Sequence, residues 1–115
     1  MAKQKVYEKE LEKLKEIFQE VDEPKRKLVE GLIEDAAFLK SENYILKQVI
    51  EKTGMVKVHP EYPELQKPTE AGKQYLKNIN SYSVVIKTLN GVLQKNAIEP
   101  EDEFDEFMKE MRGNV

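Results

Sequence analysis

The feature that most constrains this fold is an interruption at residues 54–68, GMVKVHPEYPELQKP, which holds three of the five prolines. On either side, apolar residues recur with the 4-3-4-3-4 steps of helices that pack lengthwise against each other. The chain can turn back on itself at such a connector, so the pattern predicts an antiparallel helical hairpin. The expected seam consists of Leu32, Ala36, Leu39, Asn43, Leu46 and Ile50 on one helix and of Tyr75, Ile79, Tyr82, Ile86, Leu89 and Leu93 on the other.

The predicted fold class is all-α. Helices at about residues 22–52 and 69–95 form the long antiparallel hairpin. An N-terminal helix at about residues 5–20 precedes them, and a short C-terminal helix follows after Pro100. The connector at residues 54–68 is expected to be irregular, with room for a short strand near its start.

Three residues mark the ends of the predicted long helices. Asp22 and Thr69 are residue types that cap helix N-termini with a side-chain oxygen. Gly54 can adopt the backbone conformation that commonly follows a helix C-terminus. These signals agree with the boundaries that the apolar spacing predicts.

The composition favours helices with a large exposed surface over sheet folds. Charged residues make up 36% of the 115 residues, aromatic residues 8%, and there is no Trp or Cys. Sheet folds need more aromatic and β-branched residues, and the absence of Cys excludes disulfides and thiolate chemistry. No apolar run approaches the roughly 20 residues of a membrane span, and the N-terminus lacks a signal-peptide core. We therefore expect a soluble intracellular protein without membrane contact.

Charge divides the chain into a helical body, residues 1–95, and an acidic tail, residues 96–115. The body has 17 Lys/Arg and 15 Asp/Glu, a balance of +2, whereas the tail has 2 and 7, a balance of −5. The net charge of −3 therefore hides a slightly basic body. We expect the body to carry oligomerisation and any DNA contact.

No pattern of catalytic residues occurs in the sequence. Nucleotide-binding loops, the nucleophile elbow and the zinc-protease motif are all absent. The lone histidine, His59, has no second His and no Cys to share a metal, and it precedes Pro60, which favours an extended backbone. A structural or surface role is the simpler interpretation. The sequence predicts a protein that is not an enzyme and binds no cofactor or metal.

The second helix has a second apolar face that one partner helix does not cover. The N-terminal helix can pack on it, or a neighbouring subunit can, and the two explanations are compatible. On the second explanation, the interface between copies of the chain consists of Val29, Ile33, Ile45, Val85 and Val92.

Basic residues gather in the first third of the chain, but glutamates are interleaved with them. A solvated helix face is the simpler interpretation. If the chain contacts phosphates, the N-terminal arm and the dense corner at residues 25–27 are the first choice. The predicted DNA-binding residues are therefore Lys3, Lys5, Lys9, Lys25, Arg26 and Lys27.

Asn43 is the one polar residue of the predicted seam on its helix. An antiparallel register that pairs Ile50 with Tyr75 places Asn43 opposite Tyr82. A buried amide bonded to a phenol would fix this register at some cost in stability. The alternative, in which Asn43 faces water or a subunit boundary, stays open.

The acidic tail has the signals of a short amphipathic helix. Pro100 can occupy a first turn, acidic residues follow it, and Gly113 can end the helix. A helix this short is marginal alone in water, so its apolar stripe needs a groove. The stripe packs on the body or a neighbouring subunit, or it binds a partner protein. It consists of Phe104, Phe107, Met108 and Met111.

One family shows the same order of elements: a long helix closing on Gly54, a loop carrying His59 and Pro60, and a helix with the rhythm Y-x₆-Y-x₃-IK-x-L. Here that rhythm falls on Tyr75, Tyr82, Ile86, Lys87 and Leu89. Residues 10–95 thereby resemble the small terminase subunits of tailed bacteriophages, above all the short helical type from phages of Gram-positive hosts.

The resemblance implies a DNA-packaging adaptor in the host cytoplasm. Such subunits form homo-oligomeric rings, bind double-stranded viral DNA and regulate a large terminase subunit, which holds the ATPase and nuclease. The tail stripe would then dock on the large subunit. No helix-turn-helix module precedes the hairpin here, so DNA contact would come from the N-terminal helix, the corner at 25–27 or a ring surface. The alternative is a helical protein–protein interaction module that binds no nucleic acid.

Overall fold

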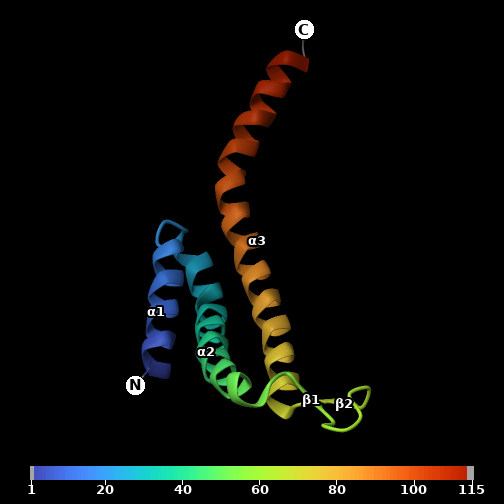
Figure 1. The fold of residues 1–115 in the computed structure, drawn as a ribbon. Helices are drawn as coiled ribbons and strands as arrows, with labels where there is room; N and C mark the ends of the chain where they lie inside the picture. Colours follow the sequence, from blue (N-terminus) through green and yellow to red (C-terminus); the bar gives the residue numbers. More distant parts are fainter. Residues whose placement is uncertain (1, 114–115) are drawn as a thin grey trace.

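Within residues 2–113, the computed structural model contains three helices and one small β-hairpin (Figure 1). It describes the backbone of residues 2–113 and the side chains of residues 2–95. Helix α1 spans Ala2–Ile17, α2 spans Glu23–Thr53 and α3 spans Glu70–Gly113, while strands β1 (Val56–Val58) and β2 (Gln66–Pro68) connect α2 to α3. The predicted all-α class and the antiparallel pairing of two long helices are confirmed.

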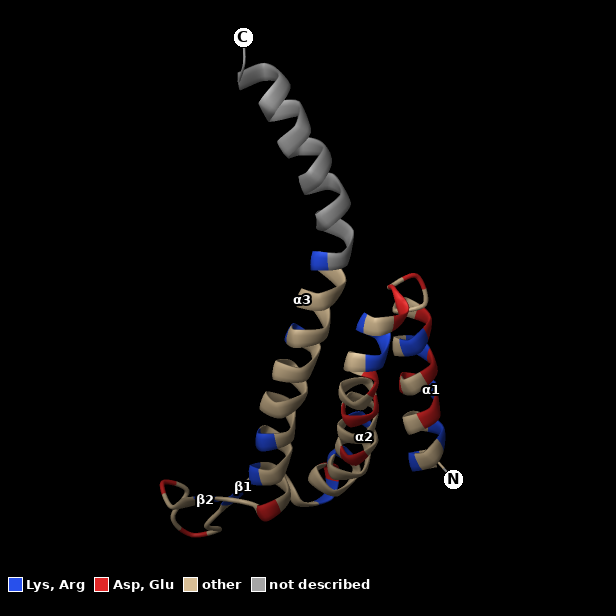
Figure 2. Ribbon diagram, turned by 180° about the vertical axis from the view of Figure 1, so that it is seen from behind, with Lys and Arg blue, Asp and Glu red and all other residues tan. Residues whose placement is uncertain are grey.

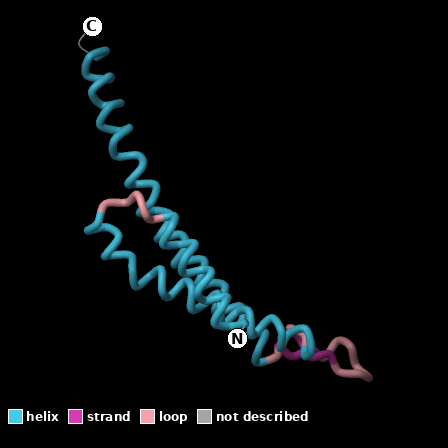
Figure 3. Tube along the Cα trace, turned by 90° about the vertical axis from the view of Figure 1, so that its left-hand side faces the viewer, coloured by secondary structure: helices cyan, strands magenta, loops and turns pink. Residues whose placement is uncertain are grey.

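The three helices form an elongated, thin molecule. Helix α1 runs antiparallel to α2, and α3 runs antiparallel to α2, so α1 and α3 point in the same direction (Figures 1 and 3). The radius of gyration is 21.3 Å and the extents are 77 × 36 × 16 Å. A compact domain of this length has a radius of gyration of about 13 Å. The chain therefore has a small interior and a large surface for its size.

The core lies where the C-terminal end of α1 and the first half of α2 meet the middle of α3. Ala36 and Ala37 are fully buried at 0% exposure, and such small side chains allow close helix packing. Helix α1 thus covers the part of the second apolar face of α2 that Val29 and Ile33 form. The core residues are Leu14, Phe18 and Val21 from α1 and the turn after it, Val29, Ile33 and Ala36 from α2, and Leu89 from α3.

The long helices begin and end where Asp22, Gly54 and Thr69 predict, but only Thr69 has all of the expected local geometry. Oγ1 of Thr69 accepts a hydrogen bond from the Gly72 N–H at 3.0 Å, which confirms the predicted N-cap of α3. Gly54 follows α2 as expected and has a φ of 79°, which favours glycine, but its ψ of 167° lies outside the left-handed helical conformation that was expected. Asp22 occupies the N-cap position of α2, but its side chain makes no capping hydrogen bond. Its carboxylate is paired with Lys25 at 3.9 Å, so the expected side-chain cap is wrong.

The connector is more regular than expected. Val56 pairs with Pro68 and Val58 with Gln66 in an antiparallel hairpin, so the expected short strand exists and has a partner. The hairpin lies close to the start of α3. A Cβ on Gly72 would be 2.6 Å from the Met55 carbonyl oxygen, so only glycine fits there.

His59 has a structural role in the hairpin. Its Nδ1 accepts hydrogen bonds from the backbone N–H groups of Glu61 and Tyr62, at 3.1 and 3.2 Å. Its backbone N–H donates to the Leu65 carbonyl at 2.9 Å, and its ring packs beside the Tyr62 ring with centroids 5.2 Å apart. His59 therefore holds the turn at the tip of the hairpin closed.

Helix α3 is longer than the predicted helix at residues 69–95. A single helix extends to Gly113, so the short helix expected after Pro100 continues α3 instead of forming a separate element. A proline within a helix removes one hydrogen bond and often ends it, which is why the sequence suggested a break. The side chains of the tail stripe, Phe104, Phe107, Met108 and Met111, lie outside the described residues, and their docking stays a prediction.

Candidate functional site

The predicted basic arm lies on α1, where Lys3, Lys5 and Lys9 are all exposed. Lys3 forms an ion pair with Glu42 of α2. Glu12 follows Lys9 by one turn and Lys5 by two turns on the same side of the helix. Carboxylates thus offset much of the positive charge of the arm, and its contact with DNA stays a prediction.

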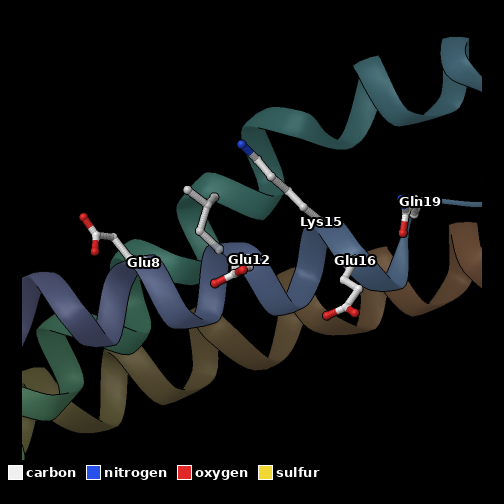
Figure 4. A pocket seen from close by; sticks show the side chains of 6 residues that line it. Glu8, Glu12, Lys15, Glu16 and Gln19 are labelled. Atoms are coloured by element: carbon white, nitrogen blue, oxygen red, sulfur yellow. The ribbon is translucent and has the colours of Figure 1, made fainter.

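The outer surface of α1 has a shallow groove of about 620 Å³ (Figure 4). Glu8, Glu12 and Glu16 contribute three carboxylates to its lining, whereas Lys15 contributes one ammonium group. This excess of negative charge repels phosphates. Within the described part of the chain, no three acidic or histidine side chains are arranged to hold a metal ion. The groove therefore offers neither a phosphate site nor a metal site.

The basic corner at residues 25–27 is also offset by carboxylates. The Lys25 ammonium lies 3.9 Å from the Asp22 carboxylate, and the Lys27 ammonium lies 3.7 Å from the Glu23 carboxylate. The Arg26 side chain is exposed. Exposed ion pairs of this kind contribute little to stability, but they reduce the local positive potential. The predicted DNA role of this corner also remains untested by the fold.

The predicted subunit interface needs correction. Val29 and Ile33 are only 3% and 4% exposed, because they pack in the core of the single chain against α1. Val85 and Val92 are half-buried against the same core. Of the five predicted interface residues, Ile45 keeps an exposed side chain. The prediction is wrong for Val29 and Ile33, since α1 occupies the face that was assigned to a neighbouring subunit.

Another line of exposed apolar residues runs along α2. Phe38, Ile45 and Val49 are 55%, 36% and 40% exposed. Their spacing of seven and four residues places them within about 40° of one another around the helix axis. We call these three residues the α2 apolar line. Within the described residues of one chain, they remain open to solvent.

A buried polar cluster joins α1 to α3. Glu10 is only 5% exposed, its Oε2 accepts a hydrogen bond from the Tyr82 hydroxyl at 2.6 Å, and its Oε1 is paired with the Lys13 ammonium at 2.6 Å. The Lys40 ammonium lies 5.5 Å from the centre of the Tyr82 ring. Glu10, which the sequence predicts to be solvated, therefore links α1 to α3 through its hydrogen bond with Tyr82.

The contacts in this cluster shift the pKa values of Glu10 and Tyr82. Burial alone would raise the pKa of Glu10, but hydrogen bonds from Lys13 and Tyr82 and the charges of Lys13 and Lys40 outweigh it, so this pKa is lowered. Burial, the hydrogen bond to Glu10 and the charge of Glu10 raise the pKa of Tyr82. Glu10 therefore stays ionised and Tyr82 stays protonated at neutral pH, which suits a structural tie.

Asn43 lies beside this cluster. It lines a cavity of about 310 Å³ between α2 and α3 together with Lys40, Tyr44, Tyr75 and Tyr82. The predicted register is therefore right in bringing Asn43 near Tyr82. The hydrogen bond between them, one of the two alternatives, is not formed, and the Tyr82 hydroxyl donates to Glu10 instead. Asn43 is 7% exposed, and its Oδ1 has no hydrogen-bond partner among the described residues.

Among the described residues, no helix has the length and apolar content needed to cross a membrane. Comparisons of the chain with protein-family models, with curated proteins and with solved structures found no match.

Proposed function

We propose that this chain is a DNA-packaging adaptor of the terminase small subunit type. In this proposal it assembles with copies of itself, binds double-stranded viral DNA and regulates a separate large subunit that holds the ATPase and nuclease. The chain itself then performs no chemical step. The sequence resemblance suggests the biological role, and the surface of the fold supports the assembly.

The observation that carries the proposal is the α2 apolar line on a thin, elongated chain. Phe38, Ile45 and Val49 extend over about 16 Å of helix, at a rise of 1.5 Å per residue. The small core leaves the single chain with little buried apolar surface. Association of copies through this line would bury more of it, and burial of apolar area is the main favourable term in association.

The assembly is tested by placing a charge on the α2 apolar line. We expect Phe38→Glu and Val49→Glu to reduce the sedimenting mass to that of a single chain at micromolar concentration, because a carboxylate buried without a partner opposes association. Both side chains point to solvent in the single chain, so the helix content measured by circular dichroism should stay unchanged.

Leu28→Glu is the matched control for these variants. Leu28 is 81% exposed on the same helix but lies about 80° around the axis from Phe38. Its replacement should leave the sedimenting mass unchanged. Equal effects of all three replacements, or none from any of them, would contradict assembly through this line.

A protein–protein interaction module without nucleic-acid binding is the second candidate. The near-balance of charges around the predicted DNA-binding residues of α1 and α2 favours it. In that case the α2 apolar line would bind another protein, and the chain would show no salt-dependent affinity for a DNA duplex.

A further inference from the structure

The excess of positive charge in the helical body lies in residues 71–95, the part of α3 that belongs to the body. Residues 2–53 have 11 Lys/Arg and 12 Asp/Glu, and residues 54–70 have 2 and 3. Residues 71–95 have four lysines and no acidic residue. Figure 2 shows the same division, with red and blue interspersed on α1 and α2 but only blue along the described part of α3 beyond its first turn. The excess of +2 in the body thus comes from residues 71–95 of α3.

The four lysines of α3 lie on one face of the helix. At 100° per residue, their side chains fall within a sector of about 80°. All four are exposed. Buried Leu89 and half-buried Tyr82 lie on the opposite side of the helix, toward α1 and α2. We call this outward surface the α3 lysine face; its charged residues are Lys73, Lys77, Lys87 and Lys95.

Within residues 71–95, little opposes the charge of this face; the acidic segment at residues 99–106 follows on the same helix. Lys73 is paired with Glu70 at 3.6 Å, but the Glu70 side chain is 92% exposed, and such pairs are readily screened by solvent. Lys77, Lys87 and Lys95 have no carboxylate between residues 71 and 95 of their own helix. Asn80 lies between the lysines on the same face and adds a polar group of the kind that contacts phosphates.

We propose that the α3 lysine face binds the phosphate backbone of double-stranded DNA, in place of the basic corner at residues 25–27. This inference rests on the proposed function and assigns its DNA-contacting surface. The four ammonium groups would contact phosphates without reading base sequence, since lysines on a phosphate backbone position a protein and carry no sequence information by themselves.

The shape of the face favours a duplex over an acidic peptide. From Lys73 to Lys95 the row extends over about 33 Å along the helix, close to one turn of B-form DNA. A stiff polyanion with evenly repeated charge can reach all four ammonium groups. A peptide would also need an apolar groove for its side chains, and the large apolar side chain within this sector is Val84 alone among the described residues.

The test compares two variants of the full chain that each lose four positive charges. The first replaces Lys73, Lys77, Lys87 and Lys95 with Gln, and the control replaces Lys15, Lys47, Lys52 and Lys57 with Gln. Gln is a good helix former, so helix content should be kept. Binding of a fluorescent 30-base-pair duplex is measured by anisotropy between 50 and 200 mM salt.

We expect the wild type and the control to share a steep salt dependence. The α3 variant should lose about 3 to 4 units of the slope of log affinity against log salt per bound chain, at roughly 0.9 per lost phosphate contact. Over the fourfold salt range this loss corresponds to about a 100-fold smaller decrease in affinity. An unchanged slope for the α3 variant, or an equal loss in the control, would overturn the assignment of this face.

The outcome for the wild type separates the two proposals. If the wild type binds the duplex and the α3 variant binds equally well, the inference about α3 is wrong and the proposed function stands. If the wild type does not bind, DNA binding and the inference both fail. If the α3 variant changes the sedimenting mass in the absence of DNA, the face takes part in contacts between copies of the chain, and the inference is overturned.

Discussion

Replacing Ile33 with aspartate is expected to unfold the helical body. Ile33 is 4% exposed in a core shared with α1 and α3. The replacement removes a large apolar side chain and introduces an unpaired charge, which together cost about 4 kcal/mol or more. Domains of this size are stable by about 5–15 kcal/mol, and a small core gives values near the lower end. Urea unfolding followed by circular dichroism should show most of the cooperative transition lost.

Ile45→Asp is the matched control for Ile33→Asp. It makes the same change on the same helix, at a side chain that is 36% exposed on the α2 apolar line. Its free energy of unfolding should stay within about 1 kcal/mol of the wild type, although self-association should weaken. If Ile33→Asp keeps its unfolding transition and only dissociates the assembly, Ile33 is an interface residue after all.

Removing the Tyr82 hydroxyl is expected to destabilise the fold by about 1.5–3 kcal/mol, the range for hydrogen bonds to charged groups. Tyr82→Phe leaves the carboxylate of Glu10 buried without its phenol donor. Tyr62→Phe, on the exposed hairpin, should have little effect. Urea unfolding at neutral pH measures both variants. If the two replacements lower the free energy of unfolding equally, the hydrogen bond between Glu10 and Tyr82 does not stabilise the packing of α1 on α3.

The same tie predicts how stability depends on pH. The pKa of Glu10 is lowered in the fold, so its contribution is present above the ordinary carboxyl range near 4.5 and is lost as the pH falls through the folded pKa. The pKa of Tyr82 is raised, so its contribution is present below about 10 and is lost as the pH rises through the folded pKa. Tyr82→Phe should flatten the alkaline decrease, which urea unfolding between pH 8 and 11 can measure.

The seam between α2 and α3 could be predicted because both helices follow one spacing rule. Ala36 and Leu89 are buried on the two sides of the expected seam, and Asn43 lies near Tyr82 as the register required. Apolar periodicity specifies which face of a helix is covered. It does not specify which element covers the face, and for this reason Val29 and Ile33 were assigned to the wrong partner.

Glu10 was missed because its type is common on solvated helices. Its partner Tyr82 lies 72 residues away along the chain, so no local pattern joins them. One signal was available: Glu10 lies three residues after Tyr7 and four before Leu14, on the apolar stripe of α1. The α3 lysine face was missed for a similar reason. Its lysines are spread over 23 residues, and only their helical angles bring them together.

Sedimentation velocity of the wild-type chain, alone and with a fluorescent DNA duplex, tests the central claim most directly. The proposed adaptor predicts a mass that is a multiple of 13.4 kDa and a duplex that sediments with the protein at 50 mM salt. Raising the salt to 0.5 M should release the duplex, because displaced counterions drive the association. A 13.4 kDa monomer beside a duplex that sediments alone at both salt concentrations would contradict the account.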